Sequence, residues 1–289
     1  MNISEMDSPY CSLADFCARS KNPLPAAVAA LLNSPVNEGK TVLIVEGADD
    51  KSVYSRFFNA ETVEIFPDGR CDMHQVILSS LNQRYFNRIA AIKDADFDHL
   101  DGKTPRFANL FLTDERDLEN MVLKNGIPLS VEEKFPGRCA AIVLDEIHRD
   151  IMMISYLRWM NDKFSLQLHF DALRLSRYYC WPYIVDIERY IADLNAASKN
   201  AEPLSLETLL QFREENPVKE LSLLTQGHDL MECLFIRAKN ISKGNFSKSV
   251  FFAAIRDSYS ADMFSKTHLC DSFRSFRKNM LIPVLRDSA

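Results

Sequence analysis

Carboxylate side chains follow two short apolar segments of the chain, at the point where each segment ends. Residues 41–45 lead into Glu46, and residues 88–93 lead into Asp94 and Asp96. Short apolar runs rich in Val and Ile are typical of strands buried on both faces of a parallel sheet. Ligands of such sheets bind outside the carboxyl ends of the strands. We therefore expect Glu46, Asp94 and Asp96 to lie together at one edge of a sheet.

Three carboxylates at one edge repel each other, and a hard cation removes that cost. Mg²⁺ prefers oxygen ligands, from one or two carboxylates and from substrate phosphates. We expect Mg²⁺ or Mn²⁺, with Asp94 and Asp96 as ligands and Glu46 as a ligand or a general acid or base. Asp50 and Glu119 could help to hold a second ion beside a phosphodiester. The alternative for Asp50 and Glu119 is a structural role, because acidic residues are favoured at the N-cap and in the first turn of a helix.

Other acidic sites fit the sequence less well. An EF-hand loop that begins at Asp94 would need Gly at its sixth position and Glu at its twelfth, where His99 and Pro105 stand. A haloacid-dehalogenase-like site would place Asp-x-Asp after the first strand, where this chain has Glu46 and Gly47. A phosphotransfer receiver would use the acidic pair at 49–50 with Asp94, and it would leave Glu46 and Asp96 without a role.

The order of these motifs resembles the TOPRIM domain of topoisomerases, primases and small nucleases. Glu46-Gly47-x-x-Asp50 follows the first predicted strand, Asp94-x-Asp96 follows a later strand, and Asp117-Leu118-Glu119 follows the next. The resemblance covers residues 41–123, and it extends loosely to residues 226–230. The family most similar in these motifs is the TOPRIM effector subunit of PARIS-type anti-phage defence systems.

That resemblance implies a Mg²⁺-dependent nuclease that acts as a toxic effector in abortive infection. RNA such as tRNA is the substrate that it implies, in preference to DNA. It also implies an AAA- or ABC-type ATPase as the partner that holds the effector inactive, and a homodimer as the active form. Two alternatives stay open: a regulatory or scaffold protein without catalysis, and a phosphotransfer domain.

The expected elements alternate between strands and helices in the first half of the chain. Strands are predicted at 41–45, 62–67, 88–93 and 108–112, with helices between the first three and a loop at 98–105 before the fourth. This pattern indicates an α/β fold with a mostly parallel four-stranded sheet. A mainly α-helical C-terminal region follows, with one long helix at 140–160 and a short strand or extended piece at 165–170. We expect a helical segment at 1–40, a TOPRIM-like catalytic domain at 41–130 and a helical domain at 131–289.

Composition indicates an ordinary globular protein. The chain has 289 residues, of which 47% are hydrophobic and 26% charged, and no stretch approaches the roughly 20 apolar residues of a membrane span. The start lacks the basic and apolar regions of a signal peptide. Seven scattered cysteines form no C-x-x-C motif, so we expect a cytoplasmic protein without disulfides or zinc.

Two further features are weaker candidates for function. The formal net charge is −6, yet residues 237–289 carry ten Lys or Arg against four Asp or Glu. Within this region Arg274, Arg277 and Lys278 would share one face of a helix predicted at 266–285, where they could contact phosphates. A solvated helix face is the alternative. His228 lies at the start of another predicted helix. It is a candidate site residue, and the alternative is a structural role.

Overall fold

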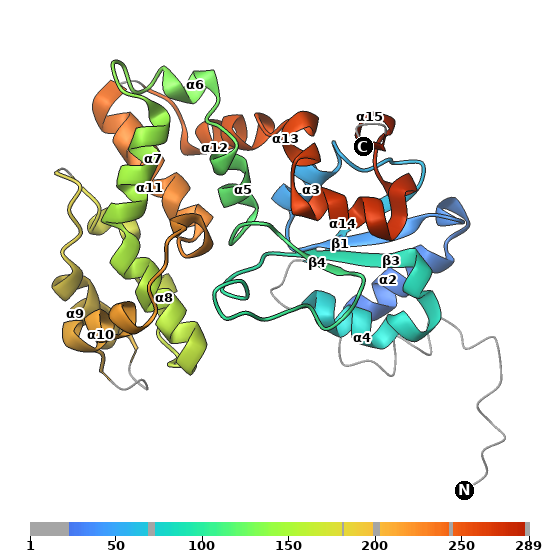
Figure 1. Cartoon of the computed structure of the whole chain (residues 1–289), viewed down its shortest axis with the longest axis horizontal. Coiled ribbons are helices and arrows are strands. Elements are labelled where there is room, and N and C mark those ends of the chain that lie inside the picture. Colours follow the sequence, from blue (N-terminus) through green and yellow to red (C-terminus); the bar gives the residue numbers. More distant parts are fainter. Residues whose placement is uncertain (1–22, 69–72, 181, 199–202, 243–244, 287–289) are drawn as a thin grey trace, which may run out of the picture. The chain divides into compact units, whose positions relative to one another are not determined.

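The four predicted strands form one parallel sheet in the computed structural model, which describes residues 23–68, 73–180, 182–198, 203–242 and 245–286 (Figure 1). The strands are β1 (Thr41–Val45), β2 (Val63–Pro67), β3 (Ile89–Lys93) and β4 (Leu110–Leu112). Their order in the sheet is β2-β1-β3-β4, and each pair of neighbours is parallel. The prediction of an α/β fold with a four-stranded parallel sheet and a helical C-terminal region is confirmed.

Burial explains why β1 and β3 are recognisable in the sequence. Every residue of these two strands is buried. The edge strands β2 and β4 each contain partly buried residues beside buried ones. A central strand that is covered on both faces needs apolar side chains at every position. The two strands that the predicted carboxylates follow are therefore the central strands of the sheet.

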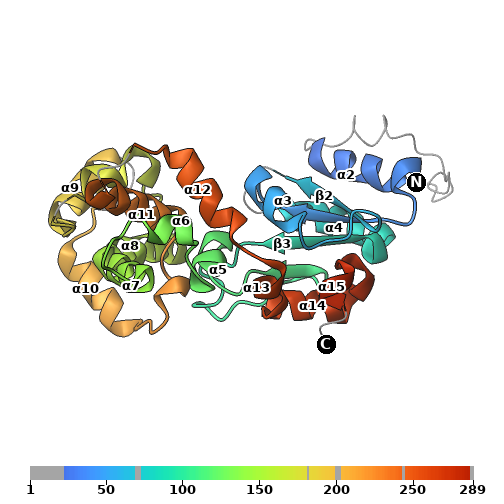
Figure 2. The same ribbon diagram turned by 90° about the horizontal axis from the view of Figure 1, so that it is seen from above.

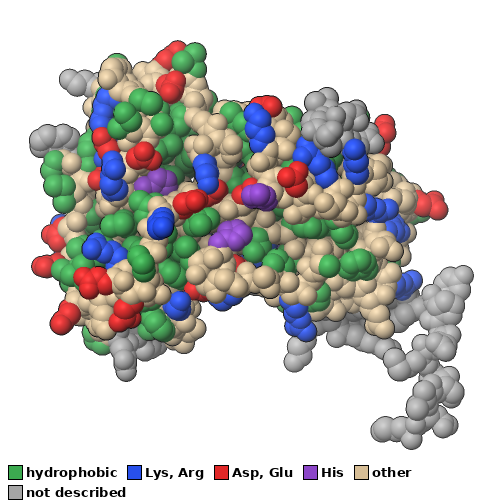
Figure 3. Space-filling view, viewed as in Figure 1, with side chains coloured by type: hydrophobic (Ala, Val, Ile, Leu, Met, Phe, Trp, Pro, Cys, Tyr) green, Lys and Arg blue, Asp and Glu red, His purple; other side chains and the backbone are tan. Residues whose placement is uncertain are grey.

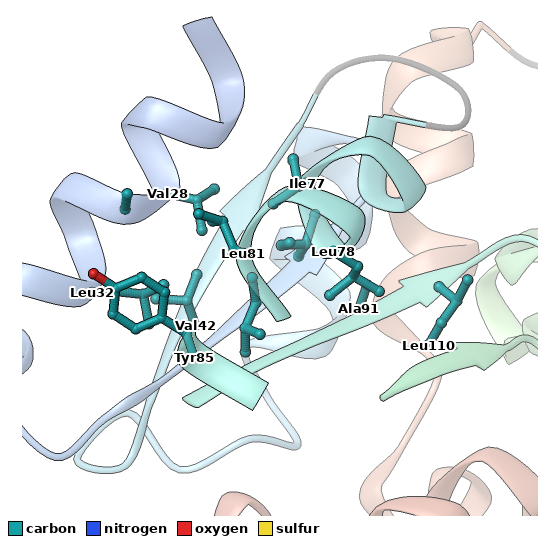
Figure 4. Close-up of a cluster of buried hydrophobic side chains, with 12 residues drawn as sticks. Val28, Leu32, Val42, Ile77, Leu78, Leu81, Tyr85, Ala91 and Leu110 are labelled. Atoms are coloured by element: carbon teal, nitrogen blue, oxygen red, sulfur yellow. The ribbon is translucent and has the colours of Figure 1, made fainter. Parts of the chain in front are cut away.

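Helices cover one face of the sheet with a continuous apolar core. α2 (Pro23–Asn33) and α4 (Met73–Tyr85) pack on Val42, Ile44 and Ala91 (Figure 4). The alternate side chains of a strand point to the other face. This clustering of buried residues from two helices and three strands identifies the main core of the sheet.

The opposite face is covered by the C-terminal end of the chain. α14 (His268–Arg277) lies on the side of the sheet opposite α2 (Figure 2). Its Phe273 packs against Phe111 of β4, with 4.3 Å between the ring centroids, and also against Phe58. Phe57 stacks on Phe264 at 4.6 Å. Residues far apart in the sequence thus complete the second layer on the sheet.

Two compact units follow from the pattern of contacts. The first, here called the sheet unit, contains the chain up to Lys93, Pro105–Leu112 and the chain from Phe264. The second, here called the helical unit, contains Asp94–Thr104 and Thr113–Met263. These units are not consecutive segments of the chain, because the chain passes between them more than once. The predicted domains at 1–40, 41–130 and 131–289 stay a prediction.

The remaining helices have the following bounds: α3 (Ala48–Tyr54), α5 (Leu118–Lys124), α6 (Leu129–Glu132), α7 (Ala140–Asp150), α8 (Met152–Phe164), α9 (Ile187–Ala197), α10 (Leu206–Glu215), α11 (Gly227–Ser242), α12 (Lys248–Asp257), α13 (Ala261–Ser265) and α15 (Pro283–Arg286). Short 3₁₀ helices are η2 (Pro35–Asn37), η3 (Phe86–Arg88), η4 (Phe170–Ala172), η5 (Leu175–Arg177), η6 (Leu221–Leu223) and η7 (Lys278–Met280). Each helix of the described segments is too short or too polar to cross a bilayer.

Several predicted elements need correction. The single helix expected at 140–160 is two helices, α7 and α8, because Ile151 between them leaves the helical conformation at φ −100° and ψ 6°. The extended piece expected at 165–170 is not a strand, and the helix expected at 266–285 ends at Arg277. The predicted N-terminal helix is confirmed for α2, and its earlier part up to residue 22 lies outside the described residues.

Candidate functional site

The two central strands end where the strand order of the sheet reverses. The chain runs from β1 to β2 on one side, and from β3 to β4 on the other. Because β1 and β3 pair in parallel, with Ile44 opposite Ala91, their carboxyl ends lie at the same edge. Glu46 and Asp94 are the residues that immediately follow these strands. A reversal of this kind is where open α/β sheets bind their ligands.

The predicted site residues divide between the two units. Glu46 and Asp50 belong to the sheet unit, and Asp94, Asp96 and Glu119 belong to the helical unit. Glu46, Asp94 and Asp96 are each partly buried. Their assembly into one metal site therefore stays a prediction.

Asp50 has a structural role in the sheet unit. Its Oδ2 accepts a hydrogen bond of 2.6 Å from the backbone N–H of Gly47, which is the residue before α3. This contact satisfies an N–H at the start of the helix and places an acidic side chain at its positive end. The structural alternative for Asp50 is thus supported, and one of its carboxylate oxygens is used by the backbone.

A third acidic residue follows a strand, and the sequence interpretation missed it. Asp68 comes directly after β2, its backbone N–H donates to the carbonyl of Val45 at 2.9 Å, and its carboxylate is buried. His74 in the first turn of α4 is fully buried, with its Nδ1 3.5 Å from Asp68 Oδ2. In the sequence, Asp68-Gly69 is also typical of a turn. The signal that could have found Asp68 is the one that identified Glu46 and Asp94, an acid placed directly after a strand.

Asp96 has an unusual backbone conformation. Its φ is +48°, a region that residues other than glycine rarely adopt. Its N–H donates to the carbonyl of Arg116 at 2.8 Å, and the N–H of Ala95 donates to Thr113 Oγ1 at 2.9 Å. Conformations of this kind persist where neighbouring contacts impose them, and they cluster at functional sites. The loop after β3 is therefore held in a defined shape.

A buried arginine lies beside this loop. The guanidinium of Arg116 stacks over Phe97 at 3.9 Å from the ring centroid, and it donates to the carbonyl of Leu224. Burial lowers the pKa of Arg116, and the charges of Asp117 and Asp96 oppose that change. Arg116 is a positive charge near Asp96 that the sequence interpretation did not identify.

Asp117 and Gly227 join the start of α5 to the start of α11. Asp117 is the N-cap of α5, and its Oδ1 accepts from the N–H of Asn120 at 2.9 Å. Its Oδ2 accepts from the N–H of Gly227 at 2.7 Å. A Cβ on Gly227 would lie 2.3 Å from Asp117 Oδ1 and 2.5 Å from Glu119 Cβ. Asp117 thus caps α5 and holds α11 beside it, and Glu119 lies in the first turn of α5, partly buried.

His228 and its neighbour Asp229 have opposite surroundings. His228 is exposed, and its ring lies 6.0 Å from that of Phe252. Asp229 is buried and pairs with Arg158, whose Nε lies 2.9 Å from Asp229 Oδ2. Residues 226–230 therefore hold α11 in place through Gly227 and Asp229, and a chemical role for His228 stays a prediction.

The predicted basic face is largely used for packing within the sheet unit. Arg274 donates to the carbonyls of Leu285 and Ser265, and Arg277 donates to Thr41 Oγ1 at 2.8 Å and to the carbonyl of Asn87. α14 ends at Arg277, and Lys278 begins a 3₁₀ helix. Arg277 thus attaches the C-terminal segment to the sheet at β1, and Arg274 links parts of that segment to each other. Figure 3 shows acidic and basic side chains intermixed over one face.

The donor atoms at the strand ends suit a hard cation. Carboxylates supply the oxygen ligands that Mg²⁺ prefers, and Mg²⁺ takes only one or two of them beside water and phosphate. In the part of the chain that the structure describes, no group of three or more His, Cys, Asp or Glu side chains is close enough to hold a metal ion together. Glu46, Asp94 and Asp96 are the residues whose chemistry fits the ion.

One histidine of the helical unit has a strongly shifted pKa. Burial lowers the pKa of His148 from 6.5 to about 4, while the charge of Asp145 opposes the change, and Nδ1 lies 3.1 Å from Thr225 Oγ1. Because the folded pKa is the lower one, the unfolded chain binds more protons between these values, and stability falls as the pH decreases through this range. We expect His148 to make the free energy of unfolding about 2 kcal/mol smaller at pH 5 than at pH 7.

Urea denaturation at both pH values measures this effect. In the His148→Gln variant the difference between pH 5 and pH 7 should shrink by about that amount, since glutamine does not titrate. An unchanged difference in the variant would show that other groups cause it.

Comparison with known proteins identifies no family. No protein-family model matches the chain, and no curated protein matches it. The interpretation of function therefore depends on the residues of this chain and on the sheet that positions them.

Proposed function

We propose that the chain is a Mg²⁺-dependent nuclease of the TOPRIM type. The observation that carries the proposal is the position of Glu46 and Asp94, which follow the two central strands at the edge where the strand order reverses. Asp96, with its positive φ, follows two residues later. Carboxylates at this edge suit chemistry on phosphate esters, where an ion shared with the substrate neutralises charge.

Each acidic residue has a distinct task in this proposal. Asp94 and Asp96 would hold the ion, which when bound polarises a phosphodiester oxygen. Glu46 would exchange a proton with the attacking or the leaving oxygen. Asp50 holds the turn between Glu46 and α3 through Gly47, so we assign it a positioning role. Glu119 is the further candidate ligand, because it lies in the first turn of α5.

The resemblance supports a more specific role as a toxic effector in anti-phage defence. An ATPase of the AAA or ABC type would hold the chain inactive, and the active form would be a homodimer that cleaves RNA such as tRNA. The helical unit, with its many helices, offers the surface for these contacts. Expression with and without the partner ATPase tests this role: growth should stop only when the effector is free and has Glu46.

Cleavage assays test the nuclease proposal itself. Purified full-length chain is incubated with total tRNA and, separately, with plasmid DNA, in Mg²⁺ or in EDTA. We expect cleavage of tRNA in Mg²⁺ and none in EDTA. Cleavage that persists in EDTA would contradict a role for the ion, and cleavage of plasmid alone would contradict RNA as the substrate. Absence of cleavage and of toxicity under all of these conditions would contradict nuclease activity.

A further inference from the structure

A cavity lies within the helical unit, apart from the strand ends of the sheet. Its volume is about 550 Å³, and it lies between α5, α7 and the segment 219–222. Pockets of this size accommodate small molecules. None of the predicted site residues lines it. The cavity therefore needs an explanation of its own.

The wall of the cavity includes a buried amide with an unused acceptor. The side chain of Asn120 is 1% exposed, and its Nδ2 donates to Asp117 Oδ1 and to the carbonyl of Thr225, both at 2.8 Å. Both partners are acceptors only, so the orientation of the amide is determined. Asn120 Oδ1 is left without a hydrogen-bond partner among the described residues. A buried acceptor without a partner is costly, and a ligand that donates an N–H or O–H removes this cost.

The mouth of the cavity carries positive charge. Arg149 and Lys219 are exposed, and neither forms an ion pair within the described part of the chain. Lys124 is neutralised by Glu115 at 2.5 Å and Glu220 at 3.3 Å. An anionic group is therefore favoured beside Arg149 and Lys219, although Asp145 reduces the net positive charge.

Apolar side chains form the rest of the wall. Leu123 comes from α5, Ala141 and Leu144 come from α7, and Leu221 comes from η6. His148, also in the wall, is neutral at pH 7, so it adds no charge inside the cavity. A flat heterocycle is compatible with such walls, because its faces are apolar and its edges carry donors.

We propose that this cavity binds a nucleoside phosphate. An N–H or O–H of the nucleoside donates to Asn120 Oδ1, the ring packs between the leucines of α5 and α7, and the phosphate lies at Arg149 and Lys219. The ligand would contact Asn120, which is held by Asp117, the cap of α5. Binding would thus stabilise the helical unit, whether or not the chain is a nuclease.

Calorimetric titration of the full-length chain tests the proposal. ATP and GTP are titrated in buffer that contains EDTA, so that no divalent ion can bridge a nucleotide to the carboxylates at the strand ends. We expect a dissociation constant below 1 mM for at least one of them, and at least about tenfold weaker binding of adenosine, guanosine and inorganic triphosphate. Binding of triphosphate as tight as that of the nucleotides would overturn the nucleoside assignment. Absence of binding by both nucleotides at millimolar concentration would overturn the whole proposal.

Variants locate the binding site. The double variant Arg149→Glu and Lys219→Glu should weaken nucleotide binding by at least about tenfold, because it replaces two attractive charges with two repulsive ones. Ala141→Trp should abolish binding by filling the cavity. Arg174→Glu reverses an exposed charge outside the cavity and should leave binding unchanged. Melting temperatures establish that each variant is folded, and equal affinity in folded Ala141→Trp would contradict this location.

Discussion

We expect Glu46→Gln and Asp94→Asn each to lower Mg²⁺-dependent cleavage of tRNA by at least about 1,000-fold. Both substitutions keep the size of the side chain and remove its negative charge. In the proposed mechanism, asparagine at position 94 would hold the ion less well, and glutamine at position 46 could not accept a proton. Both residues follow the central strands of the sheet, so the substitutions change the chemistry of the edge and leave the packing of β1 and β3 intact.

Initial rates of cleavage measure this effect, with Glu61→Gln as the matched control. Glu61 is exposed and precedes β2, at the opposite end of that strand from Asp68, so its substitution should leave the rate within about twofold of wild type. The free energies of unfolding of all three variants should stay close to that of wild type. Full activity in Glu46→Gln or Asp94→Asn, with the fold intact, would contradict the roles proposed for these carboxylates.

We expect Gly227→Ala to lower the free energy of unfolding by at least about 3 kcal/mol. The new methyl group would lie 2.3 Å from Asp117 Oδ1 and 2.5 Å from Glu119 Cβ, far inside normal contact distance. Asp117 cannot move away without loss, because its carboxylate accepts hydrogen bonds from the N–H groups of both Asn120 and Gly227. The better helix propensity of alanine, about 1 kcal/mol, does not offset this cost.

Chemical denaturation compares this variant with Gly47→Ala. A Cβ on Gly47 would lie 3.2 Å from Asp50 Oδ2, the end of a side chain that can shift slightly, so we expect a loss of no more than about 1 kcal/mol there. Nuclease activity should also fall in Gly227→Ala, because Glu119 lies beside the displaced α11. A loss in Gly227→Ala as small as that in Gly47→Ala would show that α11 can move away from α5 at little cost.

The candidate site was only partly predictable from the sequence. The acids that follow strands β1 and β3 were found because apolar runs that end in carboxylates are visible locally. Asp68, which follows β2, was missed because its neighbour Gly69 indicated a turn, and His74 was missed because nothing local marks a histidine as buried beside an acid. Asp50 was named as a ligand, and the structure uses one of its oxygens for the N–H of Gly47.

The basic residues near the C-terminus show the same limit. Arg274 and Arg277 have helical spacing, which predicted a shared surface for phosphates. In the structure their guanidinium groups donate to backbone carbonyls and to Thr41, a residue 236 positions away in the case of Arg277. Helical spacing determines which residues share a face, and it says nothing of what covers that face.

By itself the sequence determined the strands, their parallel arrangement in an α/β fold, and the acids that follow the two central strands. These features are local, because burial on both faces requires an unbroken apolar run, and a helical crossover between successive strands is typical of a parallel sheet. Only the tertiary structure decided the strand order, the return of residues from Phe264 onward to the sheet unit, the contact of Gly227 with Asp117, and the unpartnered acceptor of Asn120. Each of these depends on segments that are distant in the chain, and their packing leaves no periodic signal in the residues of either segment.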